Sequence, residues 1–380
     1  MNSRIYLDNN ATTTPDPRVV DSILAELSLG PSNPSSHHFY GQQAKQRLQQ
    51  ARLTISSFLN VTPQEIVFTS GGTESMNLLI QGMFNGKFTG HVISSTIEHS
   101  CVHHTLSNLQ QRGVELTLLS PGLLGTVSVD DIRSTLRENT RLIVLSAANN
   151  ETGVKLDMEA VSELAKSAKI PLILDGVSLL GKELFSIPSG VTGIGFSAHK
   201  FHGPKGIGFI YLRSGTKIYP LFFGGDQEYG VRPGTENLPG IIGMAKAIEL
   251  LRSELPSATH HMALLRNRLE NNLANQTNSV IINGLGKRIA NTSNLCFPGI
   301  QGEDLLIALD LQGIAVSHGS ACTSGALEPS RVLINMGIPY HLARTAIRFS
   351  LSRFTTEEEI NACISTVSTL VAKLRGSSNK

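Results

Sequence analysis

Residues 66 to 75 read Ile66-Val67-Phe68-Thr69-Ser70-Gly71-Gly72-Thr73-Glu74-Ser75, an apolar run followed by a glycine turn and the start of a helical pattern. A short apolar run of this kind is typical of a strand buried on both faces in an α/β sheet. Free N–H groups at the helix start, with the Thr73 hydroxyl, would form an anion cradle. A structural turn capped by threonine explains the same residues equally well. The segment is no P-loop, because no Gly-Lys-Ser/Thr sequence follows.

The alternation of apolar runs and helical patterns continues along the chain. Further runs lie at residues 91–93, 114–119, 142–145, 171–174, 193–196 and 207–212. We interpret them as buried parallel strands joined by helical crossovers. The sequence therefore predicts an α/β fold with a large domain, residues 15–255, in which helices cover a mostly parallel sheet.

A smaller α+β C-terminal domain is expected over residues 256–380, with residues 1–14 packing near it. A helix-rich stretch at 238–274 leads into it. Strands are predicted at 279–282, 294–297 and 346–351, and a helix at 303–311. A last helix is expected after Thr356, which forms a capping box with Glu359.

The composition gives no support for a nucleic-acid-binding, membrane-spanning or metal-binding protein. Hydrophobic residues make up 40% of the 380 residues, which fills a large core, and the net charge of +2 gives no reason to expect nucleic acid or an acidic membrane as a partner. No stretch approaches the ~20 apolar residues that span a bilayer. The N-terminus lacks a signal pattern, so a cytoplasmic location is expected. No metal site is expected, because the cysteines form no C-x-x-C pair and nothing completes the histidines at 99, 103 and 104.

Polar residues follow several predicted strands. Asp175 ends the run 171–174, Asn150 follows the run 142–145, and Lys200 lies in the polar break after Phe196. Ligands of open parallel sheets bind at the carboxyl ends of the strands. A lone aspartate could cap a turn and a lone lysine could be solvated. An acid for a pyridinium proton together with a lysine for an aldehyde is, however, what pyridoxal phosphate requires of a protein.

Two further residues stand out by their surroundings. Cys322 lies in His318-Gly319-Ser320-Ala321-Cys322-Thr323-Ser324-Gly325, a run of small residues where a thiol is exposed and reactive rather than packed in a core. Arg348 lies within an apolar strand pattern. A buried arginine pairs with a carboxylate, either of the protein or of a substrate.

Taken together, these segments resemble the cysteine desulfurases of the NifS/IscS kind, within the class V aminotransferase family. The resemblance runs from Tyr6 to Leu351. Its strongest pieces are 66–75, Glu98-His99, Asn149-Asn150-Glu151-Thr152-Gly153, Ser197-Ala198-His199-Lys200 and 319–325. It implies the fold of type I pyridoxal-phosphate transferases.

The resemblance also implies roles for single residues. Lys200 would bind pyridoxal phosphate covalently, Asp175 would pair with its pyridinium nitrogen, and His99 would stack on its ring and help to move protons. The residues implied to hold the phosphate are Gly72, Thr73, Ser197 and His199, with Thr235 reaching it from the neighbouring subunit of a homodimer.

For the reaction, the resemblance implies that Asn150 and Arg348 orient L-cysteine, Arg348 by pairing with its carboxylate. Cys322 would take the sulfur as a persulfide, leave alanine, and pass the sulfur to an iron–sulfur scaffold or another acceptor protein.

Two positions depart from the family pattern. Ser178 stands where a glutamine usually bonds the phenolic oxygen of the cofactor, and the shorter serine would need water or a shifted ring to do so. His318 stands where a small residue is usual, and either acts as a local acid or fills space.

Other functions remain open from the sequence. Selenocysteine lysis is one, and transamination, which needs no thiol, is disfavoured by Cys322. A weakened homologue that serves as a binding platform for sulfur-transfer partners is allowed by Ser178. A binding protein without a cofactor is disfavoured by Lys200 together with Asp175.

Overall fold

A computed structural model describes residues 4–319 and 328–378. Its centre is a seven-stranded sheet in the order β2-β8-β7-β6-β5-β3-β4. The strands are β2 (Ile66–Thr69), β3 (His91–Ser95), β4 (Glu115–Leu119), β5 (Thr140–Ser146), β6 (Leu172–Asp175), β7 (Val191–Ser197) and β8 (Gly208–Leu212). The predicted mostly parallel sheet is confirmed.

One strand direction was predicted wrongly. β8 runs antiparallel to both of its neighbours, β2 and β7, whereas the sequence pattern suggested a parallel strand at 207–212. The connection from β7 to β8 is short and holds only the 3₁₀ turn η3 (Ala198–Lys200). Such a connection reverses the chain, because a parallel neighbour needs a crossover of about a dozen residues or more.

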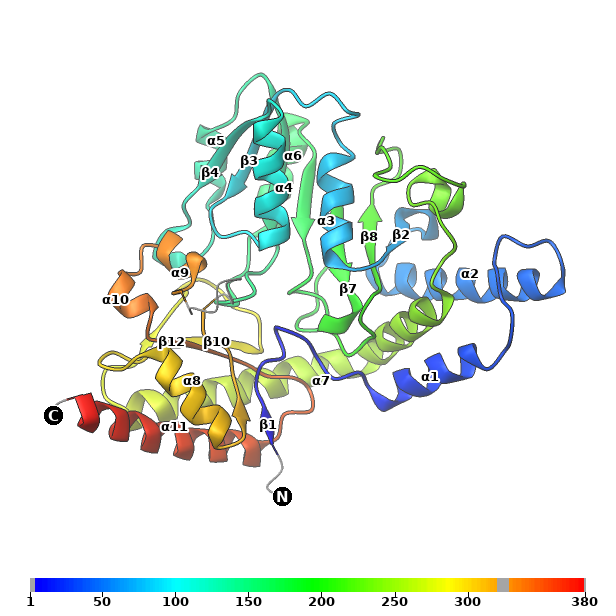
Figure 1. The fold of residues 1–380 in the computed structure, drawn as a ribbon. Helices are drawn as coiled ribbons and strands as arrows, with labels where there is room; N and C mark the ends of the chain where they lie inside the picture. The colour runs from blue at the N-terminus through cyan, green and yellow to red at the C-terminus, as the bar shows by residue number, and fades with distance from the viewer. Residues whose placement is uncertain (1–3, 320–327, 379–380) are drawn as a thin grey trace.

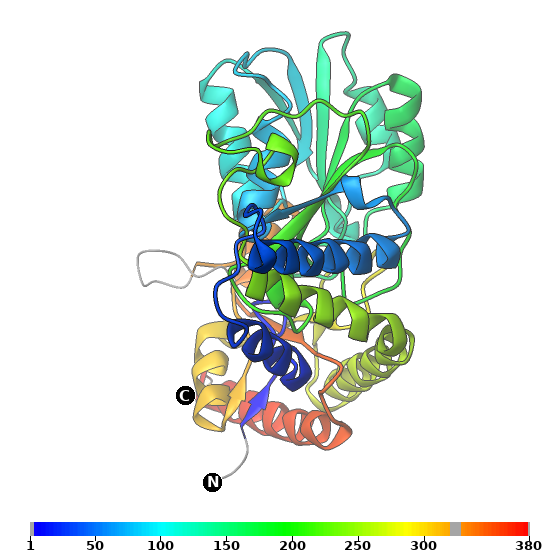
Figure 2. The same cartoon turned by 90° about the vertical axis from the view of Figure 1, so that its right-hand side faces the viewer.

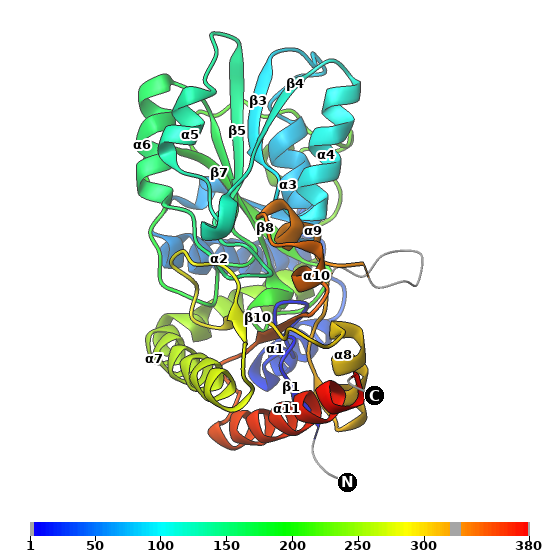
Figure 3. The ribbon, with the colours of Figure 1, turned by 90° about the vertical axis from the view of Figure 1, so that its left-hand side faces the viewer.

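Helices cover both faces of this sheet. α3 (Gly72–Gln81) and α4 (Ser100–Gln111) lie on one face, and α5 (Val129–Ser134) and α6 (Met158–Ala168) lie on the other (Figures 1 and 3). α1 (Pro17–Leu27), which begins after its N-cap Asp16, and α2 (Phe39–Leu59) pack against the long α7 (Leu238–Gln276) (Figure 2). Short 3₁₀ turns complete this part, namely η1 (Pro63–Glu65), η2 (Gly122–Leu124) and η4 (Gln227–Gly230).

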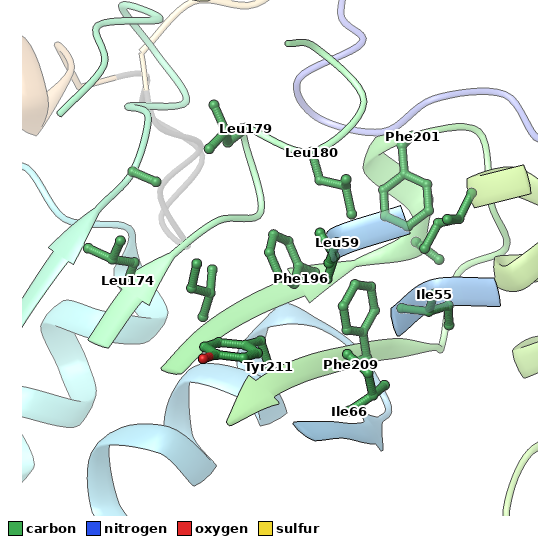
Figure 4. Close-up of a cluster of buried hydrophobic side chains, with 14 of the residues drawn as sticks. Ile55, Leu59, Ile66, Leu174, Leu179, Leu180, Phe196, Phe201, Phe209 and Tyr211 are labelled. Atoms are coloured by element: carbon green, nitrogen blue, oxygen red, sulfur yellow. The ribbon is translucent and has the colours of Figure 1, made fainter. Parts of the chain in front are cut away.

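The largest apolar cluster lies between the sheet and the layer that holds α2, α6 and α7. Phe196 of β7 stacks on Phe209 of β8 with ring centroids 4.7 Å apart (Figure 4). Leu174 of β6 belongs to the same cluster. These side chains fix the strands at whose ends Asp175 and Lys200 lie.

The C-terminal unit has its own apolar core. Its antiparallel sheet has the order β12 (Ala346–Ser350), β10 (Thr292–Cys296) and β9 (Ile281–Ile282), and β1 (Ile5–Tyr6) pairs in parallel with β11 (Ile314–Ala315). The helices are α8 (Gly302–Leu311), α9 (Arg331–Asn335), α10 (Tyr340–Ala343) and α11 (Glu357–Ser378). The predicted capping box before α11 is confirmed, since the Thr356 N–H donates to Glu359 and the Glu359 N–H donates to the Thr356 hydroxyl.

α7 contributes to both cores without a break. Leu255 belongs to the large cluster and Met262 to the C-terminal one. The division into domains at residue 255 stays a prediction. No helix in the described ranges combines the length and apolarity needed to cross a bilayer.

The core position of Leu174 leads to a stability prediction. Leu174→Ala should lower the free energy of unfolding by about 2–5 kcal/mol, because it removes buried methyl groups and leaves a cavity beside Asp175. The matched control is Leu311→Ala, since Leu311 is 78% exposed and should change stability by less than about 0.5 kcal/mol. Denaturant titration measures both, and equal losses in the two variants would contradict the proposed packing.

Candidate active site

Most of the predicted site residues line a single cavity of about 210 Å³. All strands of the main sheet except β8 run in one direction, so their carboxyl ends meet at one edge. Pairing of β5, β6 and β7 places Ser146, Asp175 and Gly195 side by side there. The lining residues are Gly72, Thr73, His99, Cys101, Ser146, Ala148, Asn150, Asp175, Val177, Ser178, Ser197, His199 and Lys200.

An anion cradle forms one end of the cavity. α3 begins at Gly72, and its N-cap Gly71 has no side chain to occupy the first N–H groups. A Cβ on Gly72 would lie only 2.8 Å from a Val177 methyl carbon, so a side chain at this position would collide with the β6–β7 connection. Free N–H groups at a helix start, with the nearby hydroxyls of Thr73 and Ser197, favour a bound phosphate or similar anion.

Asp175 is a buried carboxylate that forms no ion pair within the described ranges. In these ranges it accepts a hydrogen bond from the Val177 N–H, at 3.0 Å. Burial raises the pKa of Asp175, and the charges of His99 and Lys200 oppose that shift. A buried carboxylate with so little compensation is stabilised by a cationic or protonated partner, such as a pyridinium N–H.

Lys200 projects its amine toward the N-terminal segment. Its Nζ donates to the carbonyl oxygens of Asn10 (2.5 Å) and Ala11 (2.9 Å). Burial, followed by the charge of Arg348, lowers the pKa of Lys200 to about 8. At pH 7 roughly a tenth of the amine is therefore unprotonated and able to attack an aldehyde, far more than for an ordinary lysine.

His99 caps the start of α4. Its Nδ1 accepts from the Cys101 N–H at 3.2 Å and lies 3.1 Å from the Cys101 sulfur. Burial lowers the pKa of the His99 ring and raises the pKa of the Cys101 thiol to about 12. Because Nδ1 is an acceptor, the neutral ring carries its proton on Nε2.

His199 is also held by a fixed partner. Its Nδ1 lies 3.1 Å from the Thr12 hydroxyl, and burial lowers the pKa of the ring to about 4. A neutral His199 can therefore donate a hydrogen bond to an anion in the cradle.

Two predicted residues of the described ranges do not line the cavity. Arg348 forms an ion pair with Asp8 (2.7 Å) and donates to the Asn150 carbonyl oxygen (3.2 Å), while its Nε is buried without a partner. The ion pair with Asp8 supports a structural role for Arg348, and its role in binding a substrate carboxylate stays a prediction. Thr235 is exposed on the segment before α7. Cys322 lies outside the described residues.

His318 fills space beside β12. Its Nδ1 lies 2.6 Å from the Ala346 carbonyl oxygen and the ring is buried. A Cβ on Gly302 would lie 2.4 Å from the His318 ring. The space-filling alternative is therefore favoured over the acid.

The donor set fits pyridoxal phosphate. One cavity combines an anion cradle, a buried carboxylate without an ion pair, an amine with a lowered pKa and a flat imidazole. These groups match, in turn, the phosphate, ring nitrogen, aldehyde and ring face of that cofactor. Ser178 also lines the cavity, and its hydrogen bond to the phenolic oxygen of the cofactor stays a prediction.

No role was predicted from the sequence for Cys101 or for Glu98, although Glu98 lies in one of the segments that carry the family resemblance. Cys101 lines the cavity, and its position two residues after His99 at the start of a helix was the available signal. Glu98 is fully buried behind the cavity and accepts from the Ser95 and Ser146 hydroxyls, each at 2.5 Å. Burial raises the pKa of Glu98 to about 7.

The chain is similar to known proteins over almost its whole length. The family model described as aminotransferase class V matches residues 5–363. A cysteine desulfurase of Nostoc sp. is 40% identical over 376 residues, covering 98% of this chain and 94% of that protein.

Among solved structures, a NifS-like protein has a TM-score of 0.90 at 35% identity, over 98% of this chain and 100% of the other. A structure titled SspA in complex with cysteine has a TM-score of 0.82 at 31% identity, over 93% and 100% of the two chains.

The raised pKa of Glu98 predicts a pH-dependent contribution to stability. The folded chain binds this proton more tightly than the unfolded chain, whose carboxyl has a pKa of 4.5. The stabilising contribution is thus complete below about pH 4.5 and is lost as pH rises toward about 7, a change on the order of 3 kcal/mol. Glu98→Gln should remove it.

The measurement is the difference in unfolding free energy between the parent chain and Glu98→Gln at pH 5 and at pH 8. The parent should lose stability relative to the variant at the higher pH. The exposed Glu303→Gln is the control and should follow the parent. A constant difference between the parent and Glu98→Gln across this range would disprove the burial of a neutral Glu98.

Proposed function

The chain belongs to the class V aminotransferases and, within them, to the cysteine desulfurases, and on this basis we propose that it removes sulfur from L-cysteine with pyridoxal phosphate as cofactor. The proposal is supported above all by one observation: the buried Asp175 carboxylate and the Lys200 amine line the same cavity. The products are L-alanine and a persulfide on Cys322.

The residues that would hold the cofactor follow from the cavity. Gly72, Thr73, Ser197 and His199 would hold the phosphate, Lys200 the aldehyde carbon, and Asp175 the ring nitrogen. Pyridoxal phosphate, when bound, takes up the electron pair that the substrate α-carbon leaves when it loses its proton.

Lys200 and His99 provide the proton transfers. The Lys200 amine, whose pKa burial lowers to about 8, would be the base that accepts the α-proton of the substrate. His99 presents an N–H at Nε2, because Nδ1 is engaged by Cys101. Asn150 and Arg348 would orient the substrate, Arg348 by pairing with its carboxylate.

Sulfur transfer belongs to Cys322. Its thiolate forms an S–S bond with the substrate sulfur, and the C–S bond breaks with its electron pair left on the substrate. That carbon then takes a proton and alanine is released. The persulfide is later cleaved by an acceptor thiol, from an iron–sulfur scaffold or another sulfur-acceptor protein.

A homodimer is part of the proposal. The segment before α7 exposes Phe222, Phe223 and Tyr229 together with Thr235, and Phe223 is 94% exposed. Exposed aromatic side chains in one segment favour contact with a partner surface. Thr235 would reach the phosphate of the neighbouring subunit.

Two alternative functions are kept. Selenocysteine lyase activity would use the same residues, and parallel assays with cysteine and selenocysteine separate it. The binding-platform alternative would follow if Ser178 positions the ring poorly, and it predicts partner binding with negligible turnover.

Alanine release from L-cysteine with a thiol reductant tests the function. The parent chain should turn over, and Cys322→Ala should lose at least about a hundredfold in rate, because the only proposed sulfur acceptor of the chain is removed. Cys363→Ala is the matched control, since Cys363 is buried in the C-terminal core and away from the cavity. Equal rates in the parent and Cys322→Ala would refute the persulfide step, and negligible turnover in the parent would favour the platform.

A further inference from the structure

Two consecutive residues, Ser330 and Arg331, form hydrogen bonds with turns that carry residues of the cavity. Ser330 caps α9, and Arg331 is the first residue of that helix. Both lie shortly after residues 320–327, which contain Cys322. Neither residue lines the cavity, and the reaction described above uses neither.

Arg331 bonds the turn that carries His99. Its Nη1 donates to the Thr96 carbonyl oxygen at 2.5 Å, and its Nη2 donates to the Glu98 carbonyl oxygen. The Asn335 amide donates to the same Thr96 oxygen at 2.7 Å. A planar guanidinium that bonds two carbonyl oxygens fixes both in position, which restricts the peptide next to His99.

Ser330 bonds the second turn of the site. Its hydroxyl donates to the Glu151 carboxylate. The Glu151 N–H donates to the Asn149 side chain at 2.9 Å, and the Asn294 amide donates to the Glu151 carbonyl oxygen. The turn that contains Asn150 is therefore tied to Ser330 on one side and to β10 on the other.

An apolar cluster supports these polar contacts. Val332, Leu333 and Met336 pack with Ile97, which lies in the His99 turn. α9 thus rests on this turn through apolar and polar contacts together, while Arg331 and Ser330 supply the directional bonds.

We propose that Ser330 and Arg331 form a positioning clamp, which holds the His99 turn and the Asn150 turn in fixed relation to α9. The proposal rests on the function given above for His99 and Cys322. Arg331 and Ser330 are positioning residues, since they act through His99 and Asn150.

The charge of Arg331 has a second effect on His99. The groups that act on the ring, besides burial, are Asp175 and Glu151, which raise its pKa, and Lys200 and Arg331, which lower it. The Cys101 N–H and thiol contact Nδ1 from α4. Loss of the Arg331 charge should therefore raise the pKa of His99 and extend its protonated form to higher pH.

Arg331→Met and Arg331→Lys separate geometry from charge. Methionine removes both the hydrogen bonds and the charge, whereas lysine keeps the charge but cannot bond two carbonyl oxygens in one plane. Arg375→Met is the matched control, because Arg375 also donates to backbone carbonyl oxygens, those of Pro298 and Asn278, far along the chain from the His99 turn.

Two readouts are measured on the full chain loaded with pyridoxal phosphate. The first is the pKa of His99 from NMR of histidine-labelled protein, with the signal assigned by its loss in His99→Gln. The second is kcat and KM for L-cysteine across pH. Arg331→Met should raise the pKa of His99, move the acid limb of kcat to higher pH and lower kcat about tenfold with little change in KM, because Arg348 is untouched.

Arg331→Lys should restore the His99 pKa and the acid limb but recover kcat only in part, and Arg375→Met should match the parent in both readouts. An unchanged His99 pKa and acid limb in Arg331→Met, with kcat within twofold of the parent, would overturn the clamp. Ser330→Ala gives an independent test if Arg331→Met does not fold, and it should lower kcat without moving the His99 pKa. If the parent chain showed no turnover, only the proposed function would be contradicted. The NMR readout would still decide whether Arg331 acts on His99.

Discussion

A buried carboxylate with no ion pair in the described ranges is the constraint on which the rest of the site depends. Asp175 ends a strand that is buried along its whole length, and the only partner seen for it is a backbone N–H. Such a group costs free energy until a protonated partner arrives. Lys200, one strand away, keeps its amine partly neutral, because burial lowers its pKa. The protein thus places a carboxylate that needs a protonated partner near a partly neutral amine. The first suits a pyridinium nitrogen and the second an aldehyde.

The sheet supplies this arrangement and the C-terminal unit completes it. Parallel pairing of β5, β6 and β7 brings three strand ends to one edge, and close packing of residues such as Phe196 and Leu174 fixes them. The N-terminal segment then crosses to the site, where the carbonyl oxygens of Asn10 and Ala11 hold the Lys200 amine. β12 brings Arg348, and α9 brings Arg331 to the His99 turn. Residues from both ends of the chain therefore meet around a cavity that the sheet defines.

Much of this could be predicted from the sequence, because local patterns report buried strands and their polar ends. The strands that carry Asn150, Asp175 and Lys200 were found in this way, and so was the capping box at Thr356. The direction of β8 was not, since β8 is buried on both faces and its continuous apolar run reports this burial rather than the strand direction. Arg331 and Glu98 also escaped prediction, because their partners are distant backbone carbonyls or neighbouring hydroxyls that no spacing reveals. The pairing of Arg348 with Asp8 joins the two ends of the chain, and sequence alone could only state that a carboxylate was needed.

The most direct test of the central claim is to identify the lysine that carries the cofactor. The purified chain is reduced with borohydride in the presence of pyridoxal phosphate, digested, and mapped by mass spectrometry. We expect the pyridoxyl group on the peptide that contains Lys200, and its loss in Lys200→Ala. Lys182 is the sharpest competitor, because it is only 2% exposed and burial lowers its pKa to about 7, yet it does not line the cavity. Stoichiometric labelling of Lys182, or no labelled lysine at all, would contradict the account.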